Sequence, residues 1–359
     1  MRSCSSPMPG VTERGSSPRV TVLLAVRDGA RYLREALVSV LEQSFTSFEL
    51  LVVDDGSTDE TPEILQSYRD SRLVVLHNAH SVGLTRSLNI GLRAARGEYI
   101  ARLDADDACE PDRLATQVAF LESHPDVAAL ATGYVKIDSA GRSHGPRPAP
   151  LGRTDLRWRL LFHNPLVHSS VMIRTRVLDA VGGFDEAFRY AQDYALWCRI
   201  VRRMPIETLQ DPLVRFRVHG RSITETAGGP AAKAPLDIAV GYLRDVISTA
   251  RLPREEYDEE FAVDASRLLY PRGIEPGYED LRMLAAKILR LHDAFCRYYR
   301  LDGVEKRDRD GWLSALLRRR LLELAAARMG RRQPLAALGA ASAALRVSGS
   351  MVSRADPVA

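Results

Sequence analysis

Short apolar runs alternate with amphipathic helical stretches through the first half of this chain. The runs at 19–26 (RVTVLLAV) and 48–53 (FELLVV) lack the strict polar–apolar alternation of a half-exposed strand. Strands of this kind, each followed by a helix, are typical of a sheet that helices cover on both faces. The pattern therefore predicts an α/β, Rossmann-like fold with a mostly parallel sheet.

The predicted elements divide the chain into three parts. The expected strands are 19–26, 48–53, 73–76, 99–103 and 127–135, and the expected helices are 30–43, 58–68, 83–95 and 112–123. A Gly/Pro/Arg-rich loop is expected at 139–150, and helices are expected at 236–249, 278–301, 312–329 and 334–347. We therefore expect a disordered lead-in at 1–18, an α/β domain at 19–227 and a helical C-terminal region at 228–359.

Composition excludes several classes of protein. With 359 residues and 45% hydrophobic content, the chain should bury a substantial core. Its 50 basic and 46 acidic residues are too evenly balanced to indicate a nucleic-acid partner. The four cysteines form no CxxC pair, and we see neither a run of about 18 apolar residues nor the apolar segment of a signal peptide. We expect a reduced, soluble, cytoplasmic protein.

Carboxylates follow two of the predicted strands. Asp54 and Asp55 end one strand, and Asp104, Asp106 and Asp107 follow another. Ligands of open α/β sheets bind beyond the carboxyl ends of the strands, so both clusters should lie at the same edge. Taken alone, Asp54 and Asp55 could instead form only a turn and a helix cap. Three carboxylates within four residues repel one another unless a cation joins them, and oxygen ligands suit Mg²⁺ or Mn²⁺ held with diphosphate oxygens.

Two glycine-rich phosphate-binding motifs are missing. The chain has no G-x-x-x-x-G-K-[ST] sequence, which excludes a P-loop. Residues 25–29 (AVRDG) lack the G-x-G-x-x-G pattern after the first strand, which argues against an NAD-type site. Carboxylates and a metal ion are therefore the expected means of binding phosphate.

Several motifs occur in the order and spacing of one known family. FELLVVDDGSTDETPEIL, GLTRSLNIGLRAARGEYIARLDADD, NPLVHSSVMIRTRVLDAVGGFDEAFRYAQDYALWCRI and RFRVHGRSIT closely resemble family 2 glycosyltransferases. The resemblance covers residues 19–223. It implies the GT-A fold and an inverting, metal-dependent hexosyltransferase that uses a nucleotide sugar.

The resemblance also implies a nucleotide-binding region. At the family's base- and ribose-binding positions this chain has Ala25, Arg27, Asp28 and Asp55. At the start of the helix at 83–95 it has Gly83 and Arg86, which are expected to meet the ribose or the diphosphate. A carboxylate there can accept the imide N–H of uracil, so a UDP-sugar is the favoured donor. The family usually has Pro-Val-Tyr-Asn at 25–28. The lost aromatic leaves Arg27 as the stacking candidate, with a solvated turn as the alternative.

The metal-binding residues implied by the resemblance are Asp106 of the DxD motif and His219. Asp104 is expected to contact the ribose or the metal shell, and Asp107 to support the cluster. For His219 a purely structural role is the alternative.

The catalytic base implied by the resemblance is Asp193, with a helix cap as the alternative role. It follows Gln192, where the family commonly has Glu. His168, Gly183 and Gln192 are expected on the acceptor side of the site.

The C-terminal third carries the excess positive charge. Residues 311–359 contain eight Arg against Glu323 and Asp356, a net charge of +6. Apolar residues at helical spacing near these arginines allow either a peripheral contact with an anionic membrane or an ordinary packed helix with a basic face.

The expected function is sugar transfer in surface polysaccharide or glycolipid synthesis. The expected acceptor is a glycan or a lipid-linked sugar, and the expected location is the cytoplasm, extending to the inner face of the plasma membrane. An inactive glycosyltransferase-like binding module and a sugar nucleotidyltransferase are the alternatives. The second should have a Gly-rich basic loop after its first strand, which is not seen.

Overall fold

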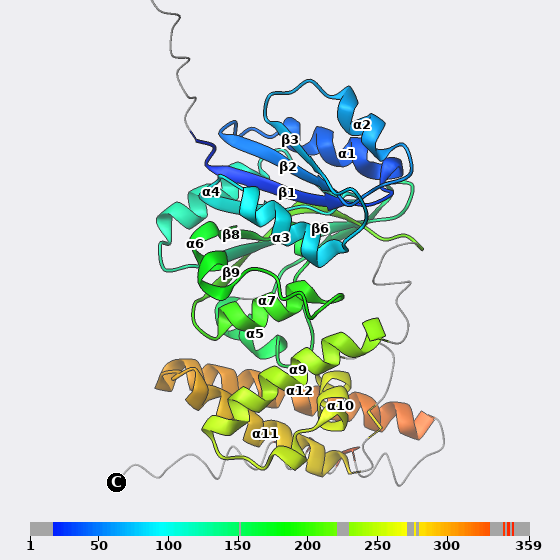
Figure 1. Ribbon diagram of the computed structural model, residues 1–359. Helices are drawn as coiled ribbons and strands as arrows, with labels where there is room; N and C mark the ends of the chain where they lie inside the picture. Colours follow the sequence, from blue (N-terminus) through cyan, green and yellow to red (C-terminus); the bar gives the residue numbers. More distant parts are fainter. Residues whose placement is uncertain are drawn as a thin grey trace, which may run out of the picture.

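One mixed sheet occupies the N-terminal part of the protein, and helices fill the C-terminal part (Figure 1). The computed structural model describes residues 17–150, 152–220, 230–270, 276–277, 280–330 and positions 340, 341, 343, 344 and 347. The strands are β1 (Val20–Val26), β2 (Phe48–Asp54), β3 (Leu73–His77), β4 (Tyr99–Arg102), β5 (Ala108–Cys109), β6 (Ala129–Ile137), β7 (Ser143–Arg147), β8 (Met172–Arg174) and β9 (Ile206–Arg217).

Helices surround this sheet and continue beyond it. Those of the α/β part are α1 (Ala30–Leu41), α2 (Thr61–Ser67), α3 (Leu84–Ala94), α4 (Arg113–Ser123), α5 (Gly152–Arg159), η1 (His168–Ser170), α6 (Thr175–Val181) and α7 (Gln192–Val201). The helical region contains α9 (Pro230–Thr249), η2 (Arg254–Glu256), α10 (Glu259–Leu269), α11 (Leu281–Tyr298) and α12 (Gly303–Gly330).

The strand order is β3-β2-β1-β4-β8-β6-β9-β5, with β7 paired to β6. The first four strands are parallel, and so is the β6–β9 pair. Strand β8 runs antiparallel to both β4 and β6, and β5 and β7 also form antiparallel pairs. The expected α/β fold is confirmed. Its sheet is more mixed than predicted. Strands β5 and β8 are too short to leave a strand pattern in the sequence, and the 12-residue strand β9 was also missed because polar and charged residues interrupt its apolar ones.

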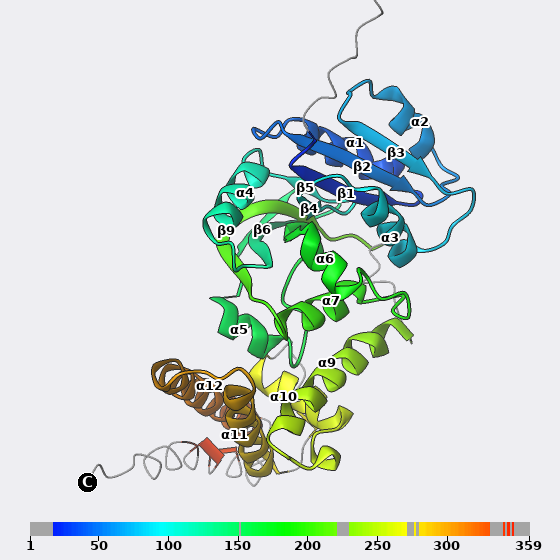
Figure 2. The same ribbon diagram turned by 60° about the vertical axis from the view of Figure 1, so that its left-hand side comes forward.

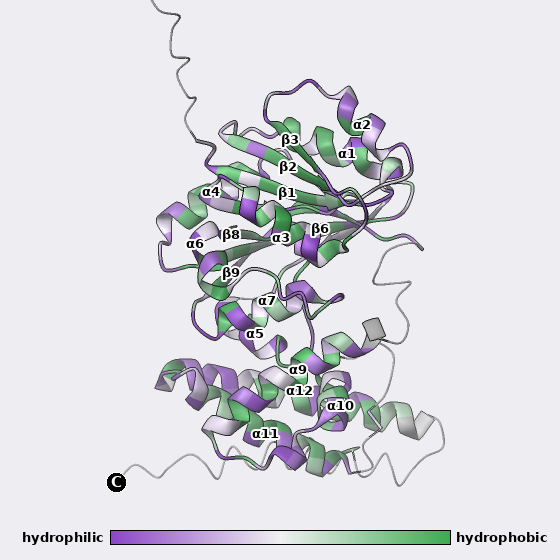
Figure 3. Cartoon of the chain, viewed as in Figure 1, coloured by the Kyte–Doolittle hydropathy of each residue, from purple (hydrophilic) through white to green (hydrophobic). Residues whose placement is uncertain are grey.

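Both faces of the sheet are buried, which explains the apolar runs. Along β1, Leu23 and Ala25 belong to one core cluster, and Val22 and Leu24 belong to the other. Successive side chains of a strand point to opposite faces, so a strand covered on both sides must be apolar throughout. Helices α1 and α4 supply the second cluster, whereas α3 and α7 supply the first. Strands β1 and β2 are accordingly hydrophobic along most of their length (Figure 3).

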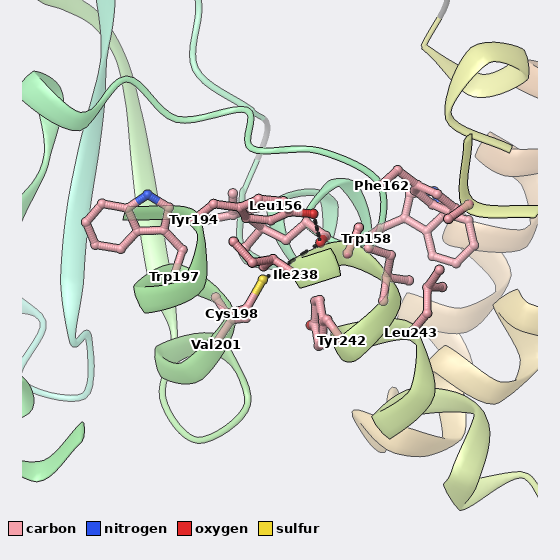
Figure 4. Close-up of a cluster of buried hydrophobic side chains, with 14 of the residues drawn as sticks. Leu156, Trp158, Phe162, Tyr194, Trp197, Cys198, Val201, Ile238, Tyr242 and Leu243 are labelled. Atoms are coloured by element: carbon pink, nitrogen blue, oxygen red, sulfur yellow. Dashed lines mark hydrogen bonds between the residues drawn. The ribbon is translucent and has the colours of Figure 1, made fainter. Parts of the chain in front are cut away.

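The helical region shares a core with the α/β part. Trp197 and Val201 of α7 belong to the same buried cluster as Ile238, Tyr242 and Leu243 of α9 (Figure 4). Figure 2 shows α9 between the sheet and the remaining helices. The predicted boundary at 227/228 lies outside the described residues, as do residues 1–16 of the expected lead-in. The two parts are held together by one continuous hydrophobic cluster.

Three of the four expected C-terminal helices are present, as α9, α11 and α12. The fourth, at 334–347, lies mostly outside the described residues. The prediction missed helix α10, whose N-cap Asp258 accepts a hydrogen bond from the backbone N–H of Phe261 (2.9 Å). It also missed β7, which was expected to be loop because Gly and Pro dominate it; this strand pairs with β6 alone, where Pro is tolerated. None of the described helices is long and apolar enough to cross a membrane.

Candidate active site

Asp107 is the buried centre of the acidic segment after β4. Its Oδ1 accepts a hydrogen bond from the backbone N–H of Arg217 (2.8 Å), and its Oδ2 accepts one from the Ser169 hydroxyl. Burial and the charges of Asp106 and Asp104 raise the pKa of Asp107 well above its ordinary value. Asp107 therefore joins three segments of the chain, as expected of a residue that supports the cluster.

Asp104 has a different environment. The Arg102 guanidinium, itself fully buried, forms an ion pair with it. The Ser169 hydroxyl oxygen accepts a hydrogen bond from the Asp104 backbone N–H (2.9 Å) and lies 3.2 Å from Oδ2 of Asp104. Burial opposes ionisation, but Arg102 and Ser169 outweigh this effect and hold the pKa of Asp104 below its ordinary value. Asp104 is thus a fixed negative charge at the carboxyl end of β4.

Asp106 and His219 lie side by side. Nε2 of His219 is 3.0 Å from Oδ2 of Asp106, and the Tyr32 ring lies 5.1 Å from the imidazole. Burial and the charge of Asp104 raise the pKa of Asp106. Because the structure brings together two predicted metal ligands from distant parts of the sequence, the donor set fits a Mg²⁺ or Mn²⁺ ion with one carboxylate, one imidazole and remaining positions for phosphate oxygens and water.

Asp55 holds the loop that leads into α3. Its Oδ1 accepts from the Asn78 amide (2.9 Å) and the Val82 backbone (2.8 Å), and its Oδ2 accepts from the Ser81 hydroxyl (2.8 Å) and the Gly83 backbone (2.9 Å). Burial alone would raise the pKa of Asp55, but these bonds lower it overall. Four donors fill the acceptor positions of the carboxylate.

The loop after β1 presents Asp28 to solvent. Asp28 has a left-handed backbone (φ 51°), and its Oδ1 accepts from the backbone N–H of Thr58 (2.7 Å). Arg27 is exposed, with its Nε 3.6 Å from Oδ2 of Asp28, whereas Ala25 is buried at the end of β1. A side chain at Gly29 would approach Ala105 of the DxD motif at 3.7 Å. The loop therefore lies against the acidic segment, with the Asp28 carboxylate still accessible.

Gly83 and Arg86 mark the start of α3. Gly83 is the N-cap, with φ 92°, a conformation that favours glycine. Its N–H is already bonded to Asp55, so it is the following amides that remain for a ligand. Arg86 is exposed and its Nε lies 3.1 Å from Glu186.

Asp193 lies in the first turn of α7. Its Oδ2 accepts a hydrogen bond from the Asn164 side chain (2.7 Å). Burial, together with the charge of Asp104, raises the pKa of Asp193 to about 6, against the bonds from Tyr194 and Asn164 that favour the ionised form. The structure thus places Asp193 within electrostatic reach of Asp104. A carboxylate with a pKa near 6 can accept a proton at neutral pH.

The three expected acceptor-side residues have different surroundings. His168 lies near Asp104, packs its ring against Phe184 and Trp197, and has its pKa lowered to about 3 by burial and the Arg102 charge. Gln192 is buried beside Asp193.

Gly183 lines a cavity of about 600 Å³. This cavity is lined by residues of α3 and α6, by the loop that follows α6 and by Arg199 of α7, and neither Asp193 nor the DxD residues line it. A side chain at Gly183 would approach Oδ1 of Asn89 at 3.0 Å.

Four residues of the site were not predicted. Arg102 pairs with Asp104, Ser169 bridges Asp104 and Asp107, and Asn164 bonds to Asp193. Arg217 donates to the Asp106 carbonyl (2.8 Å) as well as to Asp107. Asn164 and Ser169 lie in the motif NPLVHSSVM, and Arg217 lies in RFRVHGRSIT, so both quoted motifs carried a usable signal. Only the fold shows which carboxylates these residues contact.

Comparisons with known proteins find relatives of this chain. The model of glycosyl transferase family 2 matches residues 21–182. The chain is 31% identical over 217 residues to an uncharacterized glycosyltransferase of Rickettsia typhi, covering 59% of this chain and 67% of that protein. It is 29% identical over 280 residues to one of Rickettsia prowazekii (76% and 87% covered) and 27% identical over 222 residues to the amylovoran biosynthesis glycosyltransferase AmsE of Erwinia amylovora (61% and 83% covered).

Solved structures share the fold. S. aureus TarS 1-349 in complex with UDP-GlcNAc has a TM-score of 0.57 at 18% identity, with 93% of this chain and 92% of that chain covered. The mannosyltransferase PcManGT from Pyrobaculum calidifontis, in complex with GDP-Man and Mn²⁺, has a TM-score of 0.50 at 20% identity, with 95% and 90% covered. The protein is therefore a glycosyltransferase with a GT-A fold. It belongs to glycosyltransferase family 2.

Proposed function

We propose that this glycosyltransferase moves a sugar from a nucleoside diphosphate to an acceptor hydroxyl with inversion, and that Asp193 is the base. The observation that carries the proposal is the placement of Asp193, which bonds to Asn164 and has its pKa raised to about 6 by burial and by the nearby Asp104. An ionised Asp193 accepts the proton of the acceptor hydroxyl as that oxygen attacks the anomeric carbon opposite the leaving diphosphate.

Asp106 and His219 are the proposed ligands of a divalent ion, Mn²⁺ or Mg²⁺. Their 3.0 Å contact supports this assignment, as does the chemistry of the two donors. Such an ion, when bound, neutralises charge on the leaving nucleoside diphosphate. Asp104 and Arg102 form the fixed pair beside it, and Asp107 with Ser169 keeps the segment in place.

A UDP-sugar is the proposed donor. Asp55 has four protein donors, so its proposed role is to position the loop at 78–83 beneath the nucleotide. The accessible carboxylate of Asp28 is then the proposed acceptor for the imide N–H of uracil, with Arg27 as the flat cation beside the base. The amides at the start of α3, with Arg86, are proposed to face the ribose or diphosphate.

The proposed acceptor is a glycan or a lipid-linked sugar in surface polysaccharide synthesis. The name of the Erwinia relative AmsE supports this class of product. His168 and Gln192 are the proposed acceptor-side residues near Asp193, and Gly183 is proposed to shape the loop that follows α6.

The proposed membrane contact is made by the exposed arginines of α12 and not by its apolar residues. Leu313, Leu317 and Leu321 of α12 are buried in the shared core, so the apolar stripe is used in packing. Arg318 and Arg319 are exposed on the same helix. A peripheral position at the inner face of the plasma membrane would therefore be electrostatic, with vesicle binding that weakens as salt rises.

A donor panel tests the proposed function. The protein is incubated with UDP-, GDP- and dTDP-sugars and Mn²⁺, and nucleotide release is measured with and without a glycan acceptor. We expect release with a UDP-sugar, its loss in Asp106→Asn, and a large decrease in Asp193→Asn. If none of the sugar nucleotides releases its nucleotide, the proposed donor class is contradicted. If Asp193→Asn keeps full activity, the assignment of Asp193 as the base is contradicted.

A further inference from the structure

A second group of metal-binding side chains lies far from the DxD motif, where α11 meets α12. His292 and Cys296 are four residues apart on one face of α11, and Asp310 reaches them from α12. Nδ1 of His292 is 3.0 Å from Oδ1 of Asp310, and Sγ of Cys296 is 3.9 Å from Nδ1 and 3.6 Å from Nε2 of the same imidazole. One donor atom from each residue lies within 4.8 Å of the other two.

We propose that His292, Cys296 and Asp310 bind a divalent transition-metal ion of the zinc type and thereby cross-link α11 to α12. A tetrahedral zinc ion with these donors requires edges of about 3.3–3.7 Å between the ligand atoms. The distances of 3.0 and 3.9 Å lie close to this requirement, so small side-chain rotations complete the site. A water molecule would supply a fourth ligand.

The donor chemistry separates this site from the one at Asp106. Thiolate and imidazole ligands select zinc-like ions, whereas the site at Asp106 offers the carboxylate and phosphate environment of Mg²⁺ or Mn²⁺. A thiolate and a carboxylate together also balance the two positive charges of the ion, which a buried site requires.

The same three residue types can form a nucleophilic triad, but burial argues against that role here. Cys296 is 3% exposed and His292 is 2% exposed, and the Trp158 ring packs edge-on against the imidazole at 5.3 Å. A substrate needs direct access to the thiol, whereas a metal ion can be enclosed as the helices pack. The arrangement therefore favours a structural metal over catalysis.

Such a metal would also stabilise the attachment of the helical region. Arg309, the neighbour of Asp310, is buried, pairs with Asp155 of α5 (3.3 Å) and lies over the rings of Trp158 (5.7 Å) and Trp312 (4.0 Å). Holding Asp310 in place thus holds Arg309 against the α/β part.

The test uses the full-length chain carrying Asp106→Asn, which removes the other metal site. Protein produced with added zinc is desalted, and its zinc is counted by mass spectrometry; Co²⁺ is then substituted and the absorption spectrum recorded. We expect about one zinc per chain and a thiolate-to-cobalt charge-transfer band. Both should be lost in Cys296→Ser and in Asp310→Asn, and both should persist in the control Cys198→Ser, another buried free cysteine.

Two outcomes would overturn the proposal. One is a zinc content in the Asp106→Asn protein no higher than in its Cys296→Ser derivative; the other is Co²⁺ binding without the thiolate band. The spectrum needs only the protein with an intact His292–Cys296–Asp310 group, so it decides the matter even if a cysteine variant does not fold. Zinc should also raise the melting temperature of the intact group by several degrees, and have no such effect in Asp310→Asn.

Discussion

Nε2 of His219 lies 3.0 Å from Oδ2 of Asp106, although 113 residues separate the two in the sequence. The antiparallel pairing of β5 with β9, which places Ala108 opposite Arg215, brings the two segments together. The bond from the Arg217 backbone to Asp107 then fixes the register next to the site. A short strand that left little trace in the sequence thus assembles the proposed metal site.

Replacing His219 should weaken the response to metal. His219→Ala removes one of two proposed protein ligands, so we expect the Mn²⁺ concentration for half-maximal activity to rise at least about tenfold. Titration of nucleotide release against Mn²⁺ measures this effect. His144→Ala, which alters an exposed histidine, is the control and should leave the titration unchanged. Equal Mn²⁺ titration curves for His219→Ala and the unaltered protein would show that His219 is not a metal ligand.

Asp193→Asn should lower kcat by about 10²- to 10⁴-fold, because the amide cannot accept the hydroxyl proton. The affinity for UDP, measured by calorimetry, should stay within about twofold, since Asp193 does not contact the proposed nucleotide region. A comparable loss of UDP affinity would indicate that Asp193 organises the donor site instead.

Activity should fall below about pH 6, the pKa of Asp193 in the folded protein. A raised pKa means that the carboxylate is protonated, and unable to act as a base, over a wider acidic range than an ordinary aspartate. The Asn164 bond favours the ionised form, so Asn164→Ala should move the acid limb of the kcat/KM profile to higher pH. An unchanged limb in Asn164→Ala would show that another group controls it; Ser123→Ala, on α4, is a suitable control.

Asp55→Asn should destabilise the protein by about 2–4 kcal/mol, because an amide leaves buried donors of the 78–83 loop without acceptors. Urea unfolding at pH 7 measures the loss, and Asp112→Asn, an exposed aspartate, provides the comparison. The pKa of Asp55 is lowered, so its stabilising effect is complete above the ordinary aspartate pKa and disappears as the pH falls through the folded value. The difference between the variant and the unaltered protein should therefore shrink in acid. A difference that persists in acid would contradict this account.

Arg309→Ala should lower the free energy of unfolding by about 2–3 kcal/mol. This loss is smaller than for a buried ion pair whose remaining charge has no partner, because Asp155 keeps its bond to Arg159 (2.7 Å). Arg307→Ala, on the exposed face of the same helix, should change stability by less than about 0.5 kcal/mol. Urea unfolding compares the two. Similar losses in both variants would mean that the Asp155 contact does not secure the helical region.

Local patterns were sufficient for most of the fold. The apolar runs of β1 and β2 must be covered on both faces, which alone defines an α/β architecture, and the carboxylates after β2 and β4 had to meet at one sheet edge. The missed helix α10 also had a local signal, since Asp258 caps a stretch with Phe261, Ala265 and Leu268 on one face.

Sequence alone determined the α/β fold class, the acidic edge and the resemblance to family 2, because these depend on residue type and on short spacings. Only the tertiary structure decided which partners the carboxylates have. Asp104 forms an ion pair with Arg102, whereas Asp107 is buried and hydrogen-bonded to Ser169. All acceptor positions of Asp55 are taken by donors of the 78–83 loop. These differences arise from contacts across many tens of residues, and a pKa depends on burial and neighbouring charge, which no local pattern specifies.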